Sequence, residues 1–196
     1  MVFCLVIAAS VWGITLVCDR ERLNNELIRL HVVAASDAAS DQQIKLNVRD
    51  AVLKSISEEM ANITDVEEAK RYFNENLAKI ETVANRVLLE NGSQDTATVS
   101  LGKEKFDMRR YDTFTLPAGV YETLRITIGE GNGKNWWCVA FPALCVGATA
   151  QEFEAVAAGA GFPEILTAAL EGRDGYQLRF YFLELLGRMQ NKLLQE

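Results

Sequence analysis

Histidine is nearly missing from this sequence, because His31 is the only one among 196 residues. A nucleophilic triad needs a base beside its nucleophile, and no G-x-S-x-G elbow surrounds any serine. A zinc site needs about four ligands, and the chain offers too few. The sequence therefore predicts no catalytic triad, no metal and no cofactor. A lone histidine on a strand is more often a structural or surface residue than a catalytic one.

Positive charge is also scarce: 20 Lys and Arg residues stand against 27 Asp and Glu residues, for a net charge of −7. The longest basic cluster is Arg109-Arg110. Phosphate binding needs clustered basic side chains, so this composition argues against a nucleic-acid surface.

A complete phosphate-binding motif is missing as well. The loop Gly129–Lys134, with the sequence GEGNGK, lacks the spacing of a Walker loop, and Asn135 follows Lys134 where that motif has Ser or Thr. The third glycine of the dinucleotide fingerprint is absent too. We expect a glycine turn that leaves a strand, and no small-molecule substrate.

Low-complexity linkers and internal repeats are absent, and the apolar share of 49% is ordinary for a globular protein. One domain over residues 23–196 is the simplest organisation.

Met1–Cys18 contains no charged residue, which is typical of a signal-peptide core or a marginal transmembrane helix, with a buried helix as the alternative. We assign residues 1–22 as a signal peptide or membrane anchor and expect the chain to be exported.

Two cysteines, Cys138 and Cys145, lie in the expected folded part with six residues between them. In an oxidising compartment a disulfide between them can persist. Two buried, reduced thiols are the alternative.

Hydrophobic periodicity predicts two helices followed by strands. Leu27–Ala35 alternates as a half-buried strand does. Ser40 and Gln43 form a capping box that starts a helix to about Met60, and Thr64 with Glu67 starts a second helix to about Glu90, ended by Asn91-Gly92. Extended segments are expected near residues 97–101, 105–116 and 121–128, with a turn at 117–119; the tail patterns as a short helix over 151–158, an aromatic strand and a final helix. This order predicts an α+β fold with the helices packed on one face of a mostly antiparallel sheet.

Trp136 and Trp137 are adjacent in a segment rich in aromatic residues and cysteine. Neighbouring residues on a strand point to opposite faces, so one tryptophan can fill the core while the other reaches the surface as an anchor for a partner. The alternative is that both belong to the core.

Three segments of the chain carry a family signature. The first joins IRLHVVAASD, at 28–37, to DQQIKLNVRDAVL, at 41–53. The second, FTLPAGVYETLRITIGEGNGKNWWCVAFPALC at 114–145, is the most specific, and LRFYFLELL at 178–186 is weaker. Together these segments resemble stage II sporulation protein R of endospore-forming bacteria.

The resemblance implies a secreted signal that is not an enzyme. Members are made in the forespore and exported into the space between the forespore and mother-cell membranes, where they activate a membrane-embedded aspartic protease that processes pro-sigma-E. It also implies a partner-binding role for the matched residues: Arg29, His31, Asp37, Asp41, Lys45, Arg49, Asn135, Trp136 and Trp137. An ion-paired helix face is the structural alternative for those on the helix.

Two other functions stay open at this point. An exported cell-envelope hydrolase could use the carboxylates Asp37, Asp41 and Asp50 as acid and base, although acids at a helix start are common for structural reasons. A structural adaptor held at the membrane by an uncleaved leader is the other.

Overall fold

The computed structural model describes residues 24–111 and 115–142. The chain divides into two compact units. Of the larger unit, residues 27–104 and 122–142 are described; of the smaller, residues 24–26, 105–111 and 115–121. The predicted division at residues 22 and 23 stays a prediction, because residues 1–23 lie outside the described part.

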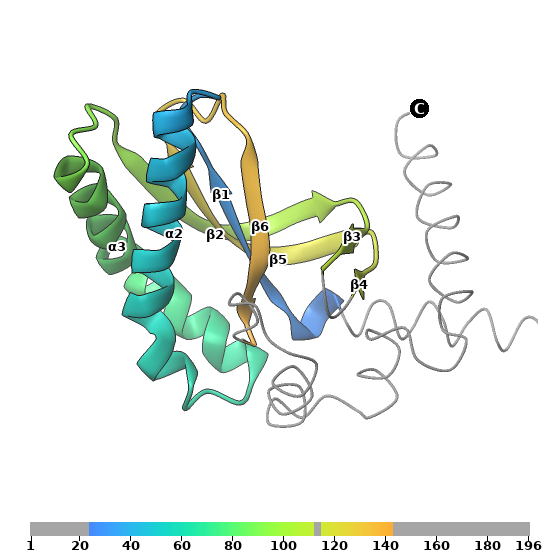
Figure 1. Ribbon diagram of the computed structural model, residues 1–196. Helices are drawn as coiled ribbons and strands as arrows, with labels where there is room; N and C mark the ends of the chain where they lie inside the picture. Colours follow the sequence, from blue (N-terminus) through green and yellow to red (C-terminus); the bar gives the residue numbers. More distant parts are fainter. Residues whose placement is uncertain (1–23, 112–114, 143–196) are drawn as a thin grey trace, which may run out of the picture. The chain divides into compact units, whose positions relative to one another are not determined.

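A four-stranded sheet forms the centre of the larger unit (Figure 1). Its order is β2 (Ala97–Phe106), β5 (Gly119–Ile128), β1 (Ile28–Val33) and β6 (Asn135–Phe141). β1 runs parallel to β5 and antiparallel to β6, and β2 and β5 run in opposite directions. The sheet is therefore mixed and mostly antiparallel.

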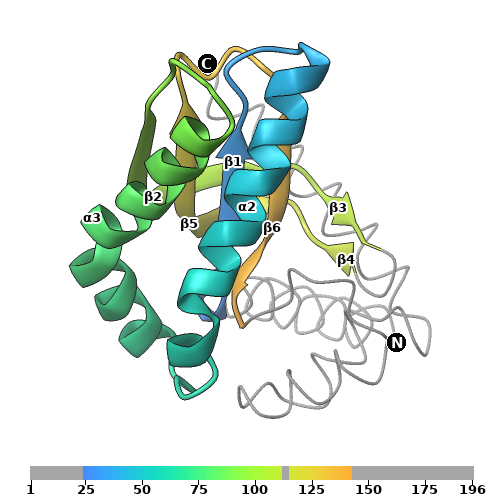
Figure 2. The same cartoon turned by 60° about the vertical axis from the view of Figure 1, so that its left-hand side comes forward.

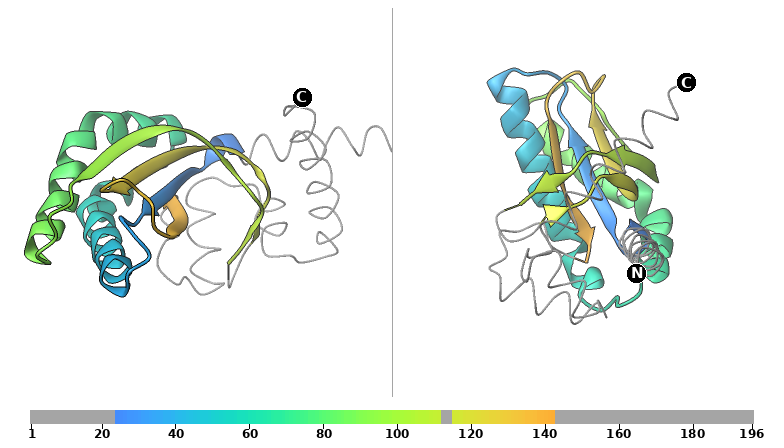
Figure 3. Two further views of the ribbon diagram at one scale, coloured as in Figure 1. Left: turned by 90° about the horizontal axis from the view of Figure 1, so that it is seen from above. Right: turned by 90° about the vertical axis from the view of Figure 1, so that its right-hand side faces the viewer.

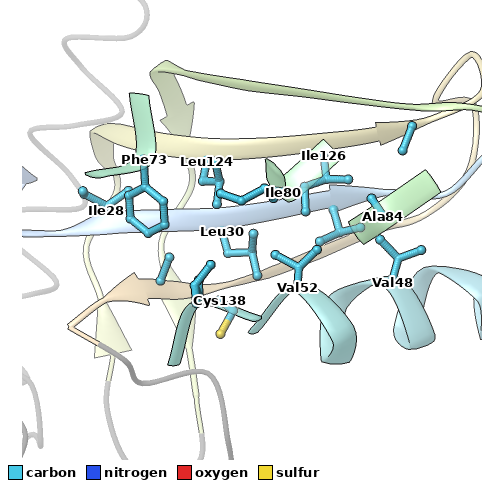
Figure 4. Close-up of a cluster of buried hydrophobic side chains, with 14 of the residues drawn as sticks. Ile28, Leu30, Val48, Val52, Phe73, Ile80, Ala84, Leu124, Ile126 and Cys138 are labelled. Carbon is cyan, nitrogen blue, oxygen red and sulfur yellow. The ribbon is translucent and has the colours of Figure 1, made fainter. Parts of the chain in front are cut away.

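Two helices, α2 (Ala39–Met60) and α3 (Val66–Glu90), cover one face of this sheet (Figures 2 and 3). Their apolar stripes meet alternate residues of the strands in one core (Figure 4). The core includes Leu30, Val52, Phe73, Ile80 and Leu124. Burial of each such side chain stabilises the fold by about 1.5–3 kcal/mol. The predicted α+β fold, with helices on one face, is confirmed.

In the smaller unit, β3 (Arg109–Arg110) pairs antiparallel with β4 (Thr115–Leu116). The Tyr121 hydroxyl donates to the Pro117 carbonyl oxygen at 2.6 Å, and the ring of Tyr121 meets Phe106 edge-on. The extended stretch expected over 105–116 is thus divided between the end of β2 and two short strands.

Both predicted helix caps are wrong in detail. α2 begins at Ala39 with Ala38 as N-cap and no side-chain cap, because the Ser36 hydroxyl accepts from Ala38 N and stabilises the turn before the helix. In α3 the cap is Asp65, whose carboxylate accepts from the backbone N–H of Glu67 and Glu68. An acidic cap interacts favourably with the helix dipole, which an uncharged Thr64 cannot do.

The ends and lengths of both helices match the prediction, and the C-terminal turn of α3 contains Gly92 at φ 72°. The tail helices and strand expected beyond residue 150 lie outside the described residues. Within the described part, no helix has the length and hydrophobicity needed to cross a membrane.

Candidate recognition surface

Strand alternation separates two faces of the sheet. Leu30, Val32 and Ile126 point toward the helices and join the core. The intervening residues point the other way, to what we call the distal face. On this face, register places His31 beside Arg125 of β5 and Trp137 of β6.

His31 is the centre of a polar group on the distal face. Its Nδ1 lies 2.7 Å from Glu104 Oε2, and its Nε2 lies 2.9 Å from Asn135 Oδ1. Its ring stacks on Trp137, with centroids 5.6 Å apart and planes 21° apart. His31 is only 7% exposed. Because a carboxylate can only accept, Nδ1–H donates to Glu104, and both ring nitrogens are engaged.

Glu104 extends this group across the sheet. Its second oxygen lies 3.0 Å from Arg125 Nη1, and Arg125 Nε donates to the Thr127 hydroxyl at 3.1 Å. One partly exposed carboxylate on β2 therefore links β5 and β1, and Asn135 continues the link to β6. We call Glu104, Arg125, His31, Asn135 and Trp137 the His31 cluster.

Arg29 lies two residues before His31 on the same face of β1, and it is completely buried. Its register neighbours are Thr123 of β5, also completely buried, and Val139 of β6. The structure thus places this predicted partner-binding residue in the interior. His31 is buried as well, and the exposed part of its cluster includes Asn135 and the partly exposed Trp137.

Asp37, Asp41 and Lys45 lie together at the junction of β1 and α2, where the backbone of Lys134, the residue before Asn135, joins them. Asp37 accepts from the backbone N–H of Lys134 at 2.8 Å, and Asp41 accepts from the Ser36 hydroxyl. These contacts attach the glycine loop to the start of α2. A structural role accounts for each of the two carboxylates.

Lys45 completes this junction from inside. It is 4% exposed, and its ammonium donates to Gln42 Oε1 at 2.7 Å and to the Lys134 carbonyl oxygen at 2.9 Å. Burial lowers the pKa of Lys45 from its usual value, and the nearby Asp37 charge opposes this shift. The structural alternative was an ion pair between Asp41 and Lys45 on the helix face. The Lys45 ammonium instead donates to two neutral oxygens.

The glycine loop is a turn between β5 and β6, as predicted. Gly129 and Gly131 have φ of 57° and 68°, a region that favours glycine. Gly133 N–H donates to the Ala34 carbonyl oxygen, and a Cβ at Gly133 would collide with the backbone oxygen of Ser36. The loop thus packs closely against the end of β1.

The two tryptophans do point to opposite faces. Trp136 packs against the core on the helix side, where the Arg49 guanidinium lies 4.2 Å from its ring centroid. Arg49 also pairs with Asp50 at 2.7 Å. Trp137 lies on the distal face with His31. The prediction that the two tryptophans face opposite sides of the sheet is confirmed, with Trp136 packed against the core and Trp137 beside His31, and both side chains are partly buried.

Cys138 follows them on the helix side, where it is buried and disulfide-bonded. Its pairing with Cys145 stays a prediction, because Cys145 lies outside the described residues.

Sequence reasoning missed Glu104 and Arg125. The signal in the sequence was weak. Each is a charged residue on a strand whose apolar residues face the core. Only the strand order, which places β2 and β5 beside β1, shows that they face His31. In the described ranges, no group of three or more His, Cys, Asp or Glu residues could hold a metal ion.

The fold and the cluster define a class: an α+β domain with a helix-covered core and a polar, aromatic surface on the opposite sheet face. The family model of stage II sporulation protein R matches residues 24–151. The chain belongs to this family. It is 40% identical, over 121 residues, to stage II sporulation protein R of Bacillus subtilis (strain 168). The match covers 62% of this chain and 54% of that relative, so it spans about half of the relative's length. No solved structure matches.

Proposed function

We propose that this chain is a secreted sporulation signal that acts by binding. In this proposal it is made in the forespore and exported into the space between the forespore and mother-cell membranes, either released or held by its N-terminal segment. There it activates a membrane-embedded aspartic protease, which processes pro-sigma-E in the mother cell. Family membership supports the place in sporulation.

The observation that favours binding over catalysis is the engagement of His31. Both of its ring nitrogens are hydrogen-bonded within the sheet, and its ring is covered by Trp137. A general base must be able to reach a proton of its substrate. His31 instead organises Glu104, Asn135 and Trp137 into a fixed surface, and pre-organisation reduces the entropic cost of binding.

The carboxylates of the hydrolase alternative are also engaged. Asp37 holds the backbone of Lys134, Asp41 accepts from Ser36, and Asp50 pairs with Arg49. Single substitution of these residues discriminates the two functions. An enzyme should lose orders of magnitude of activity from one carboxylate change while its fold persists. A binding signal should lose activity only where the fold is weakened.

Activation by binding is a population shift. A partner that binds the active state of the protease more tightly than the inactive state increases the active fraction. A tenfold preference corresponds to about 1.4 kcal/mol of differential binding free energy. The His31 cluster supplies an aromatic anchor and polar groups of the kind that dominate interface energies.

The test is co-expression of this chain, the protease and the sigma-factor precursor in a non-sporulating bacterial host, with and without residues 1–18. We expect precursor processing that requires both the chain and its leader. The mass of the exported chain separates a released signal from an anchored adaptor. No processing, with the chain folded and exported, would refute the proposed function.

A further inference from the structure

β2 is an edge strand of the sheet (Figure 3). A hydrogen bond at its start shows which of its backbone groups face outward. The Thr96 carbonyl oxygen accepts from Gly129 N–H at 2.8 Å, so Thr96 faces β5. Backbone groups alternate in direction along a strand. Ala97, Val99, Leu101 and Lys103 therefore direct their N–H and C=O groups away from the sheet.

Helix α3 protects only the first part of this edge. The Asn85 side chain donates to the Ala97 carbonyl oxygen and accepts from Ala97 N–H, at 3.0 and 2.8 Å. Glu81 Oε2 accepts from Val99 N–H at 3.0 Å. Among the described residues, no side chain of α3 bonds to the outward groups of Leu101 or Lys103, and no strand lies beyond them.

Gly102 lies between these two residues, and nothing in the described structure requires a glycine there. A Cβ on Gly102 would meet no atom within 4 Å, and its φ is not in the positive region. Glycine inside a strand weakens it and often marks a place where another backbone approaches closely. Gly102 is also exposed, so the space beside it is open to a partner.

The charge at this edge selects among occupants. Lys103 is exposed, whereas the neighbouring Glu104 is already paired with Arg125 and His31. The free charge of the open edge is therefore positive on a chain with a net charge of −7. Pairing with a second copy would bring two Lys103 side chains into one ladder and two negative chains together, both of which are unfavourable.

We propose that the edge of β2 at Leu101–Lys103 binds an extended segment of the partner, which adds a strand to the sheet and places an acidic side chain near Lys103. This inference rests on the proposed function and names the chemistry of its partner. Backbone hydrogen bonds to Leu101 and Lys103 supply affinity, as in strand addition to other exposed edges. Leu101 packs toward the helices, so Gly102 faces the distal side, where it leaves room for a side chain of the incoming segment.

The full chain in the co-expression host tests this with paired variants. Lys103→Pro removes the outward N–H but no hydrogen bond within the sheet, and Lys103→Ala removes only the charge. Gly102→Val fills the open space and favours strand conformation. Lys54→Ala, at an exposed lysine on α2, is the control for lost charge.

We expect Lys103→Pro and Gly102→Val to lower processing at least about tenfold, and Lys103→Ala about two- to fivefold. Lys54→Ala should leave it unchanged. Thermal unfolding checks each variant, and Gly102→Val carries the test if Lys103→Pro does not fold. Folded Lys103→Pro and Gly102→Val proteins with normal processing would overturn the inference.

A photo-crosslinking residue at Lys103 separates this inference from the proposed function. A covalent adduct with the protease supports edge binding, even if the wild-type chain causes no processing and activation is refuted. An adduct of two copies of this chain overturns the assignment of the occupant. Processing by the wild-type chain without any adduct to the protease also overturns it.

Discussion

Alanine substitutions of the two adjacent tryptophans test whether the helix-side face of the sheet serves stability and the distal face serves binding. Trp136→Ala removes a ring packed against the core and its contact with Arg49. For a partly buried tryptophan we expect a loss of about 2–4 kcal/mol in the free energy of unfolding. This corresponds to a fall in Tm of about 5–15 °C for a chain of this size.

Trp137→Ala removes the ring stacked on His31 on the distal face. The stacked pair contributes about 0.5–1.5 kcal/mol, so Tm should fall by only about 1–6 °C. Processing in the co-expression host should nevertheless fall at least about tenfold, because an interface anchor contributes about 2 kcal/mol or more.

Thermal unfolding by circular dichroism and the processing assay, run on both variants, give the comparison. Trp137→Phe, which keeps an aromatic ring beside His31, is the conservative control and should retain part of the processing. Equal destabilisation by the two alanine substitutions would refute the separate roles of the faces. So would full processing by folded Trp137→Ala protein.

Three further predictions test the described contacts. Glu104→Gln should lower the free energy of unfolding by about 1–2 kcal/mol in chemical denaturation, because it removes the negative charge that binds His31 and Arg125. An unchanged free energy would contradict the stabilising role of Glu104 in the His31 cluster. Lys45 has a lowered pKa in the folded state, so the folded chain binds fewer protons than the unfolded chain between that pKa and 10.5. Stability relative to Lys45→Met should therefore rise with pH through this window, and a flat difference in urea midpoints would exclude the burial argument. Gly133→Ala should cost about 1–3 kcal/mol through collision with Ser36, whereas Gly102→Ala, which meets open space, should change thermal stability by less than about 0.5 kcal/mol; equal effects would refute the close packing of the loop.

Local pattern was sufficient for the first strand, for both helices and for the opposite directions of the two tryptophans. The alternation of the segment at 27–35 predicted β1, and the apolar stripes predicted both helices. The prediction that β1 is half-buried was wrong, because all six of its residues are buried. The opposite orientation of Trp136 and Trp137 followed from strand geometry alone. These features depend on neighbours a few residues apart, which the sequence displays directly.

Strand pairing and the partners of His31 depend on distant residues and were not predictable in this way. β1 pairs in parallel with β5, about which periodicity says nothing. The helix starts also escaped the capping rule, since a serine four residues before Ser40 stabilises the turn ahead of α2. Competition among several Ser and Asp residues near one helix start is decided by the path of the preceding strand.

The His31 cluster has a consequence for when the surface comes into existence. Its members lie on four strands, and Glu104 and Asn135 are 73 and 104 residues beyond His31 in sequence. During synthesis, or in any passage of the unfolded chain through a pore, His31 has emerged long before either partner. β1 gains its second neighbour only once Asn135–Phe141 is in place. The proposed recognition surface therefore exists only in the completely folded chain. A truncated or half-emerged chain contains His31 without the partners that complete the cluster.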